Sequence, residues 1–181
     1  ESADKNWLLT GNFELNETSR CEREAIELSQ AIIEKVCSYL NAQIGIIYLF
    51  ENGQLHQAGS YAFHVRKQNT NMVSMGEGLV GQAAREKKMI VFTEVPDDYI
   101  KINSGLGNVI PKNLVVLPLV QDGNLRGVME IGTARSLSKL DMEFLNMITE
   151  SMAIVLSAAQ SRTKLKELLE ETQLQAEQLE A

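Results

Sequence analysis

Apolar residues near the start of the chain recur at the spacing of amphipathic helices. Scattered apolar positions from Trp7 to Leu15 predict a helix over the first twenty residues. Ser19 and Glu22 have the S-x-x-E spacing of a capping box, in which each side chain accepts a hydrogen bond from the backbone N–H of the other residue. We therefore expect a second helix to begin at this box. Its apolar face would consist of Ile26, Ile33, Val36, Cys37 and Leu40.

The period then changes to that of a strand followed by a tight turn. Ile44 to Phe50 is rich in β-branched and aromatic side chains, which favour strands. Asn52-Gly53 follows at once, and both residues tolerate the positive φ that a two-residue hairpin turn requires. The pattern predicts a β-hairpin whose returning strand covers Leu55 to Ala62.

A second hairpin is predicted further along the chain. Asp122-Gly123 separates two strand-like segments, Leu114–Val120 and Leu125–Thr133. Pro118 has no N–H for a strand ladder, so we expect an edge position or a bulge there. Because hairpins pair antiparallel, the fold class is α+β with a central antiparallel sheet and helices packed on one side. Between the hairpins we expect a short helix, Leu79–Lys87, and a short strand, Met89–Thr93.

The segment Gly76–Gly81 matches the G-x-G-x-x-G pattern of dinucleotide-binding turns. Those glycines would allow a pyrophosphate to approach a helix N-terminus, and Asp97 and Asp98 lie near where a ribose-binding carboxylate would be. However, the preceding segment is short and half polar, unlike a buried parallel strand, and antiparallel hairpins flank the region. We interpret the motif as a glycine-rich turn that leads into a helix.

From Ser138 to Ala181 the chain reads as one helix, ~65 Å long at ~1.5 Å per residue. Apolar positions alternate steps of four and three residues, the period of a coiled-coil seam. A helix packed only on its own domain is the alternative, because some seam positions are polar. The seam positions are Phe144, Ile148, Ser151, Val155, Ala158, Arg162, Leu165, Leu169, Thr172, Ala176 and Leu179. A partner helix explains the stripe better, and we expect a homodimer through the terminal helices. The chain thus divides into lead-in helices (1–40), a sheet core with a loop region (41–135) and a dimer helix (136–181).

Charge and composition narrow the classes of function. The 181 residues carry a formal net charge of −7, and no basic face is evident. Nucleic-acid and anionic-lipid binding are therefore disfavoured. No apolar run approaches the ~18–20 residues of a membrane span. The two cysteines, Cys21 and Cys37, form no C-x-x-C pair, and their scarcity fits a reducing compartment. We expect a cytoplasmic fragment of a longer protein, whose other parts could include a membrane anchor.

An ordered series of segments carries a family resemblance. The segments are Gly76–Lys88, Val91–Ile100, Ser104–Gly107, Asn113–Leu119 and Gly127–Ile131, with Trp7–Gly11 and Gly45–Leu49 before them. Taken in this order they closely resemble GAF domains attached to bacterial sensor histidine kinases. The similarity covers about residues 5 to 165. It implies a small-molecule pocket on one side of the sheet. It also implies flanking helices that form a parallel dimer and lead to a covalently linked output domain.

Departures from known GAF subgroups limit the cofactors. The Asn-Lys…Phe…Asp-Glu signature of cyclic-nucleotide GAF domains is absent. Bilin-binding and methionine-sulfoxide-reducing relatives need cysteines in the sheet or pocket loops, whereas both cysteines lie early in this chain. His56 and His64 are the only histidines, and His64 is poorly placed for haem. We therefore predict no bilin, haem, cyclic nucleotide, NAD or metal site, and the ligand stays unidentified.

Two functions remain open for the domain, and an enzyme is disfavoured because no nucleophile lies beside a base. The first is a sensor that binds a small molecule and relays its state through dimer helices to an output domain such as a histidine kinase. The second is a ligand-free module for dimerisation and interaction. The ligand candidates are Tyr48 and Glu130 on the sheet, with Tyr61, Tyr99, Ser104 and Asn113 on the loops. Each of them also has a structural interpretation, which for Glu130 is a carboxylate bonded to backbone or solvent.

Overall fold

The computed structural model describes residues 1–20, 23–62, 72–96, 102–104 and 107–181. The helices are α1 (Ser2–Ser19), α2 (Ala25–Leu40), α3 (Gly78–Glu86) and α4 (Lys139–Glu180). The strands are β1 (Ile44–Glu51), β2 (Gln54–Tyr61), β3 (Met72–Ser74), β4 (Ile90–Thr93), β5 (Ile102–Ser104), β6 (Gly107–Val109), β7 (Asn113–Gln121) and β8 (Asn124–Thr133).

Six strands form one antiparallel sheet in the order β3-β2-β1-β8-β7-β4, and β5 and β6 form a separate hairpin. The two predicted hairpins are confirmed. Asn52 and Gly53 have φ of 52° and 77°, and Asp122 and Gly123 have φ of 49° and 76°. Positive φ at both turn residues matches the twist of the flanking strands. The predicted α+β class with a central antiparallel sheet is therefore correct.

Pro118 lies where the sequence predicted, near the free end of β7. The partner strand β4 pairs with β7 only from Asn113 to Val116, so β7 has no neighbour on that side at Pro118. The register with β8 also shifts between Leu119 and Val120. Because the ladder is already incomplete here, the missing N–H of proline costs little.

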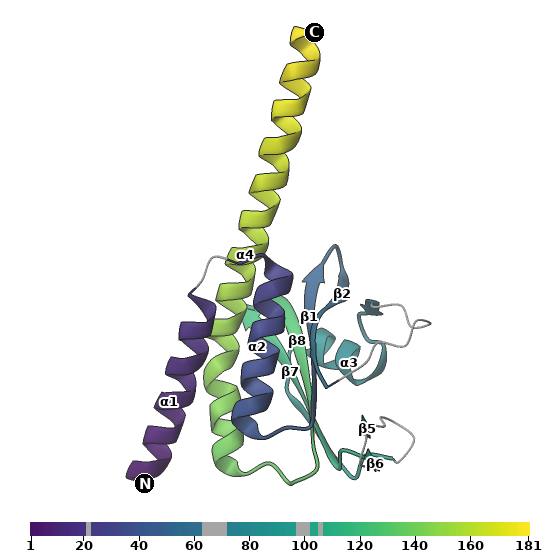
Figure 1. Cartoon of the computed structure of the whole chain (residues 1–181). Coiled ribbons are helices and arrows are strands. Elements are labelled where there is room, and N and C mark those ends of the chain that lie inside the picture. The colour runs from purple at the N-terminus through teal and green to yellow at the C-terminus, as the bar shows by residue number, and fades with distance from the viewer. Residues whose placement is uncertain (21–22, 63–71, 97–101, 105–106) are drawn as a thin grey trace.

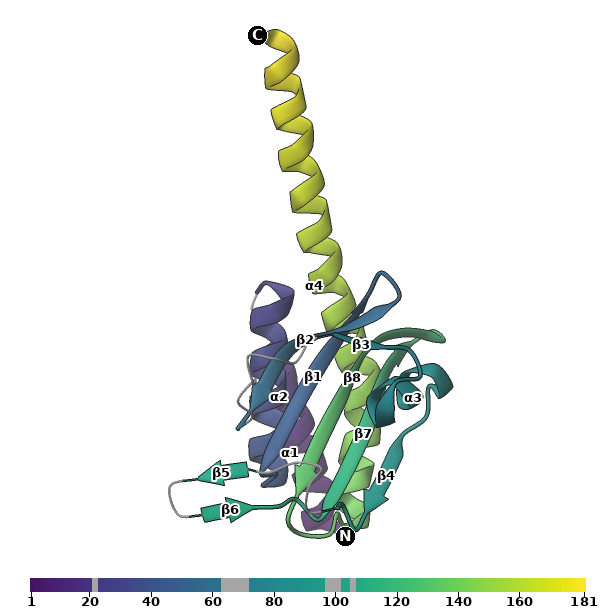
Figure 2. The ribbon, with the colours of Figure 1, turned by 90° about the vertical axis from the view of Figure 1, so that its right-hand side faces the viewer.

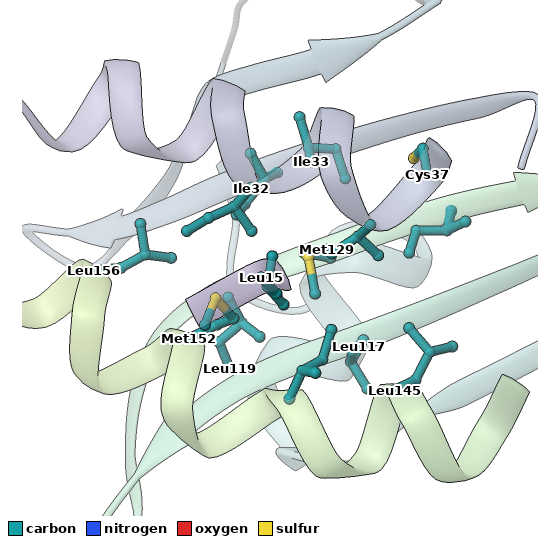
Figure 3. Packing of buried hydrophobic residues seen from close by; sticks show 14 of the residues in the cluster. Leu15, Ile32, Ile33, Cys37, Leu117, Leu119, Met129, Leu145, Met152 and Leu156 are labelled. Atoms are coloured by element: carbon teal, nitrogen blue, oxygen red, sulfur yellow. The ribbon is translucent and has the colours of Figure 1, made fainter. Parts of the chain in front are cut away.

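Helices α1, α2 and the first part of α4 lie side by side and cover one face of the sheet (Figure 1). Alternate residues of the central strands, among them Leu117, Leu119 and Met129, point into this layer (Figure 3). They meet Ile32 of α2 and Leu156 of α4, all almost fully buried. Fully burying a side chain of this size contributes about 1.5–3 kcal/mol, so this layer is the main source of stability.

Aromatic rings join α1 to the rest of this layer. Trp7 stacks on Tyr39 of α2 with ring centroids 4.8 Å apart, and both rings contact Phe144 of α4. The Tyr39 hydroxyl donates to the Trp7 carbonyl. The close approach requires Gly11, because a Cβ there would collide with Tyr39 and with Phe144. The helix α1 is thus part of the core rather than a loose extension.

Two expectations about the helices are corrected. Ser19 does not cap α2: it is the last residue of α1, and its hydroxyl donates to the Leu15 carbonyl, while α2 begins at Ala25. Phe144 and Ile148 are 1% and 0% exposed within a single chain, so they face the domain core and not a dimer seam. Both errors arise because sequence spacing shows a periodic stripe without showing what covers it.

The start of α4 is fixed by a network that joins three elements. Ser138 and Asp141 form a capping box, and Arg135 donates to both carboxylate oxygens of Asp141 and to the Leu40 carbonyl at the end of α2. Burial raises the pKa of Asp141, but hydrogen bonds from Arg135 and Ser138 outweigh this effect and hold the pKa below its ordinary value. The carboxylate therefore stabilises the junction while it stays ionised.

Beyond the sheet, α4 continues as a single rod (Figure 1). Every residue from Lys164 to Ala181 is exposed. One 18-residue window of α4 reaches a mean hydropathy of 1.2, so the helix meets the length and composition of a membrane span, contrary to the sequence expectation. Because 39% of that window is buried inside the domain, its apolar residues are partly explained by core packing.

Figure 2 shows α3 in front of the sheet, on the face opposite to the other three helices. The glycines of the G-x-G-x-x-G segment build the turn that leads into α3. Gly76 and Gly78 have φ of 84° and 61°, and a Cβ at Gly81 would lie 2.5 Å from the Ser74 carbonyl oxygen. The Gly76 N–H donates to the Gly81 carbonyl over 2.8 Å, and Glu77 accepts from the Ser74 N–H. The motif closes on itself, which supports its interpretation as a structural turn.

Candidate functional site

Glu130 lies at the centre of the sheet on the face that α3 covers. It is on β8, and its neighbours across the sheet are Ile46 of β1 and Val116 of β7. Residues directly opposite in an antiparallel ladder point to the same face. Ile46 and Val116 both belong to the buried cluster beneath α3, so the Glu130 side chain also points to that side. The side chain is only 8% exposed.

The carboxyl group of Glu130 has no hydrogen bond and no ion pair with any described part of the chain. Burial alone raises its pKa from 4.5 to about 7. A buried carboxylate is costly because it loses hydration and gains nothing in return. Over the described ranges, no backbone group bonds this carboxylate, so the backbone-bonded interpretation finds no support there.

The surroundings of Glu130 are apolar on the described elements. Toward one end of β8, Val128 and Leu125 pack under Val80 and Ala83 of α3. Toward the other end, Gly132 faces Pro111, whose Cβ would lie 3.1 Å from a Cβ at that glycine. The carboxyl group thus lies between α3 and the segment that leads from β6 to β7. The described sheet residues in this position provide no positive charge that would compensate an ionised Glu130.

Tyr48 lies beside Glu130 on the same face. It pairs with Val128, two residues before Glu130, so the two side chains are diagonal neighbours on adjacent strands. Diagonal neighbours are ~7 Å apart, within reach of one small ligand. Tyr48 is buried, and both it and Ser60 have interaction partners inside the chain. The structure therefore brings two of the predicted site residues together.

A family model now identifies the fold. The model described as a GAF domain matches residues 22–157.

This chain belongs to the GAF family.

Solved GAF structures agree with this assignment. The GAF domain of a phosphoenolpyruvate-protein phosphotransferase from Coxiella burnetii superposes with a TM-score of 0.71 at 15% identity, covering 87% of this chain and 96% of that one. The A. aeolicus nlh2 GAF domain in an inactive state gives 0.67 at 19% identity, covering 88% and 99%. A free methionine-R-sulfoxide reductase from Neisseria meningitidis in complex with its substrate gives 0.64 at 16%, covering 88% and 91%. At these identities the likeness shows the fold alone. Among curated proteins, none matches the chain.

Two other predicted ligand residues of the GAF domain are placed away from this site. Tyr61 pairs with Gly45, which faces Cys37 of α2, and the Tyr61 ring packs against the helical layer. The Asn113 amide donates to the Arg135 carbonyl over 3.0 Å. Both side chains have structural roles, and neither contacts the α3 side. The alternation of side chains along a strand places them on the opposite face from Glu130.

The remaining candidates fall partly outside the described structure. Tyr99 lies outside the described residues, and Ser104 is the last residue of β5, whose side chains are likewise outside the described part. Two site residues were missed by the sequence analysis: Ile46 and Val116, which flank Glu130. Side chains alternate along a strand, so counting two residues back from Tyr48 would have placed Ile46 on the same face of the sheet. Val116 can be placed beside Glu130 only once the pairing of β7 with β8 is known.

The cysteine and histidine positions offer no reactive centre in the described regions of the GAF domain. Cys37 is fully buried in the helical layer, and burial raises the pKa of its thiol to about 12, so it stays protonated. The His56 ring contacts the Glu51 carbonyl at 3.3 Å. Cys21 and His64 lie outside the described residues. No three His, Cys, Asp or Glu side chains of the described ranges gather as metal ligands would.

An open hollow of about 310 Å³ lies where α4 leaves the domain beside the start of α2. Its walls are largely charged, and Glu24 accepts a hydrogen bond from Thr163 over 3.0 Å and lies 4.0 Å from the Lys166 ammonium group. The lining residues are Arg23, Glu24, Glu27, Ala159, Arg162, Thr163 and Lys166. Since these side chains are mostly exposed, the contacts are weak and serve to position α4.

Proposed function

We propose that this GAF domain is a non-catalytic sensory module that binds a small molecule on the α3 side of its sheet. The observation that carries this proposal is the buried Glu130 carboxyl group at the centre of that face, which has no partner among the residues that the structure describes. Buried charges in proteins are normally paired, so an unpaired one beneath a covering helix is a candidate for ligand recognition. GAF domains are commonly small-molecule sensing or regulatory modules, which agrees with this assignment.

A route for the signal runs from this site into α4. The strand β8 that carries Glu130 leads directly to Arg135, and Arg135 holds both Asp141 at the start of α4 and the end of α2. A ligand that prefers one position of β8 would therefore bias the position of α4. Only such a difference in affinity shifts the equilibrium, and a ~10-fold preference corresponds to about 1.4 kcal/mol. The output domain would be covalently linked, and a histidine kinase is the candidate that the sequence resemblance supplies.

We further propose that the exposed rod of α4 pairs with the same rod of a second chain. Leu165, Leu169 and Leu179 are 62%, 63% and 88% exposed, and no described residue covers them. In the part of α4 that packs on the sheet, Phe144 and Ile148 are buried and cannot contact a partner helix. Met147 and Ile154, which are 39% and 44% exposed, are the seam candidates in their place. Of the other seam candidates, Val155 is half-buried and packs on the domain core, whereas Ala158 is exposed. A parallel coiled coil would cover this stripe.

The sensory function can be tested by identifying what the protein binds. Protein purified from cells under native conditions would be denatured, and its released small molecules would be measured by mass spectrometry. In parallel, thermal unfolding would be followed with a library of metabolites. We expect at least one compound to bind with a defined stoichiometry and to raise the unfolding temperature.

The control is an α3-side variant that fills the site, Val116→Phe, checked for its fold by circular dichroism. A bound compound should be lost from this variant and kept by Leu179→Ala on the exposed rod. If no compound co-purifies and none raises the unfolding temperature, the sensor proposal is wrong. The alternative of a ligand-free dimerisation module would then explain the exposed helix.

A further inference from the structure

The chemical class of the ligand can be inferred from the groups that face Glu130. On the sheet, the residues beside it are Ile46, Val116 and Val128, which are apolar, and Tyr48. Glu130 is therefore the only carboxylic acid in this group of neighbouring sheet residues. A ligand that pairs with Glu130 must compensate one negative charge in an environment with little water.

No cation of the chain that the structure describes provides this compensation. Two basic residues at α3 are engaged elsewhere: Arg85 donates to the Met75 carbonyl, and Lys87 donates to the Gly123 carbonyl. Arg126, four residues before Glu130 on β8, has a buried Nε without a hydrogen-bond partner and forms no ion pair with Glu130. Glu86 on the same helix is exposed, and Gln82 donates to it. The strands β1 and β7 present no charged side chain to Glu130 on this face. Within the part of the chain that the structure describes, no group supplies the counter-charge, so a ligand that brings one would allow Glu130 to be ionised when the site is filled.

Resting on the proposed sensory function, we propose that the ligand is a small organic cation, an ammonium or guanidinium group on an apolar body, whose nitrogen pairs with the Glu130 carboxylate. Charge-assisted hydrogen bonds to a carboxylate are about twice as strong as neutral ones, and weak hydration of the site strengthens them further. The apolar body fits the aliphatic walls that flank the carboxyl group. A carboxylate or phosphate ligand would instead be repelled by Glu130.

Other partners for Glu130 are less consistent with the same observations. A divalent metal ion would need several oxygen ligands, whereas no second acid lies beside Glu130 on the described elements. A neutral ligand could accept a hydrogen bond from the protonated carboxyl group, but it would then bind better at low pH. The sign of the pH dependence therefore distinguishes a cation from a neutral acceptor.

The test uses matched probes that differ only in charge. Isothermal titration calorimetry and thermal unfolding would be measured with isopentylamine and 2-phenylethylamine as the matched cations, and with agmatine as an additional, doubly charged cation that carries a guanidinium group. Isopentanol and 2-phenylethanol are the neutral counterparts, and 3-methylbutanoate and phenylacetate are the anions. We expect at least one cation to bind, and its neutral and anionic counterparts to bind at least about tenfold more weakly.

Two further measurements connect the binding to Glu130. Binding of the cation should weaken about tenfold between about pH 8 and about pH 6, because the empty site takes up a proton in this range. Glu130→Gln should weaken binding at least about tenfold and remove the pH dependence, while Glu143→Gln on the exposed side of α4 should change neither. The pH profile of the unaltered protein supplies the same information if Glu130→Gln does not fold.

Three results would overturn the cation assignment. They are failure of all three cations to bind at millimolar concentration, equal binding of the neutral counterparts, and binding that strengthens as the pH falls. If a neutral or anionic molecule co-purifies with the protein, the cation inference is wrong while the sensory function stands. If neither probes nor cellular compounds bind, both proposals fail.

Discussion

Replacing the buried acid with its neutral isostere should stabilise the ligand-free protein at neutral pH. Glu130→Gln keeps the length and shape of the side chain and removes its charge. In the native fold, the Glu130 carboxyl group is 8% exposed and has no partner among the described residues, so ionisation is opposed by burial. Glutamine leaves a polar amide in the same place, but it requires no buried charge.

The size of the effect follows from the pKa of Glu130, which is raised from 4.5 to about 7. Between these values, the folded protein keeps a proton that the unfolded chain has lost, so stability falls as the pH rises. Below about pH 4.5 both states are protonated and no penalty applies. Above about pH 7 the full penalty applies, and at about 1.4 kcal/mol per pKa unit it reaches at most about 3.5 kcal/mol. The free energy of unfolding of Glu130→Gln should therefore rise relative to wild type by up to this amount between about pH 4 and about pH 8.

Urea unfolding followed by circular dichroism at several pH values measures this difference. Glu143→Gln, an exposed acid on α4, is the matched control and should follow the wild type at each pH. The reasoning is refuted if the difference between Glu130→Gln and wild type stays constant across this pH range. In that case Glu130 would be compensated in the free protein, and the case for a cationic ligand would lose its basis.

Three further changes test the fold and the assembly. Gly59→Ala should destabilise the protein by about 1–3 kcal/mol in urea unfolding, because the new Cβ would lie 2.8 Å from the Gln30 backbone. An unchanged unfolding midpoint would show that α2 can move away from β2. Asp141→Asn should lower the free energy of unfolding by about 1–3 kcal/mol at neutral pH. The difference from wild type should shrink in acid, where the wild-type carboxylate, whose pKa is lowered, becomes protonated. A difference that persists in acid contradicts the ion pair with Arg135 as the cause. Leu165→Lys combined with Leu169→Lys should convert a dimer to a monomer, as measured by light scattering. Truncation after residue 157 should have the same effect. A dimer that persists in both variants argues against the coiled-coil seam.

The secondary structure was largely predictable because it depends on local sequence signals. Both hairpin turns consist of residues that tolerate positive φ, and the change from helical to strand periodicity at Ile44 is sharp. The boundary between α1 and α2 was wrong, since the S-x-x-E spacing at Ser19 occurs without a cap. The real capping box at Ser138 has aspartate at its last position, with Arg135 as an additional partner from outside the helix.

The site was predictable only in part, because a side chain's face depends on strand register. Glu130 was singled out as an acid inside an apolar strand, and the structure places it in the interior, where no described residue is its partner. Tyr61 and Asn113 are polar residues on strands, as Glu130 is, but they lie on the other face of the sheet. Tyr61 packs against the helical layer, and the Asn113 amide donates to the Arg135 carbonyl. Sequence spacing gives no information about which of two faces a residue takes until the pairing is known.

The sequence by itself determined the elements of this GAF domain: the antiparallel hairpins, the glycine turn before α3 and the single long C-terminal helix. These depend on backbone conformations that neighbouring residues impose. Only the tertiary structure decided that Phe144 and Ile148 belong to the core, that Leu165 and Leu169 are exposed, and that Glu130 is buried with no counter-charge among the described residues. The reason is that burial and charge compensation depend on segments that are distant in the chain and meet only after folding.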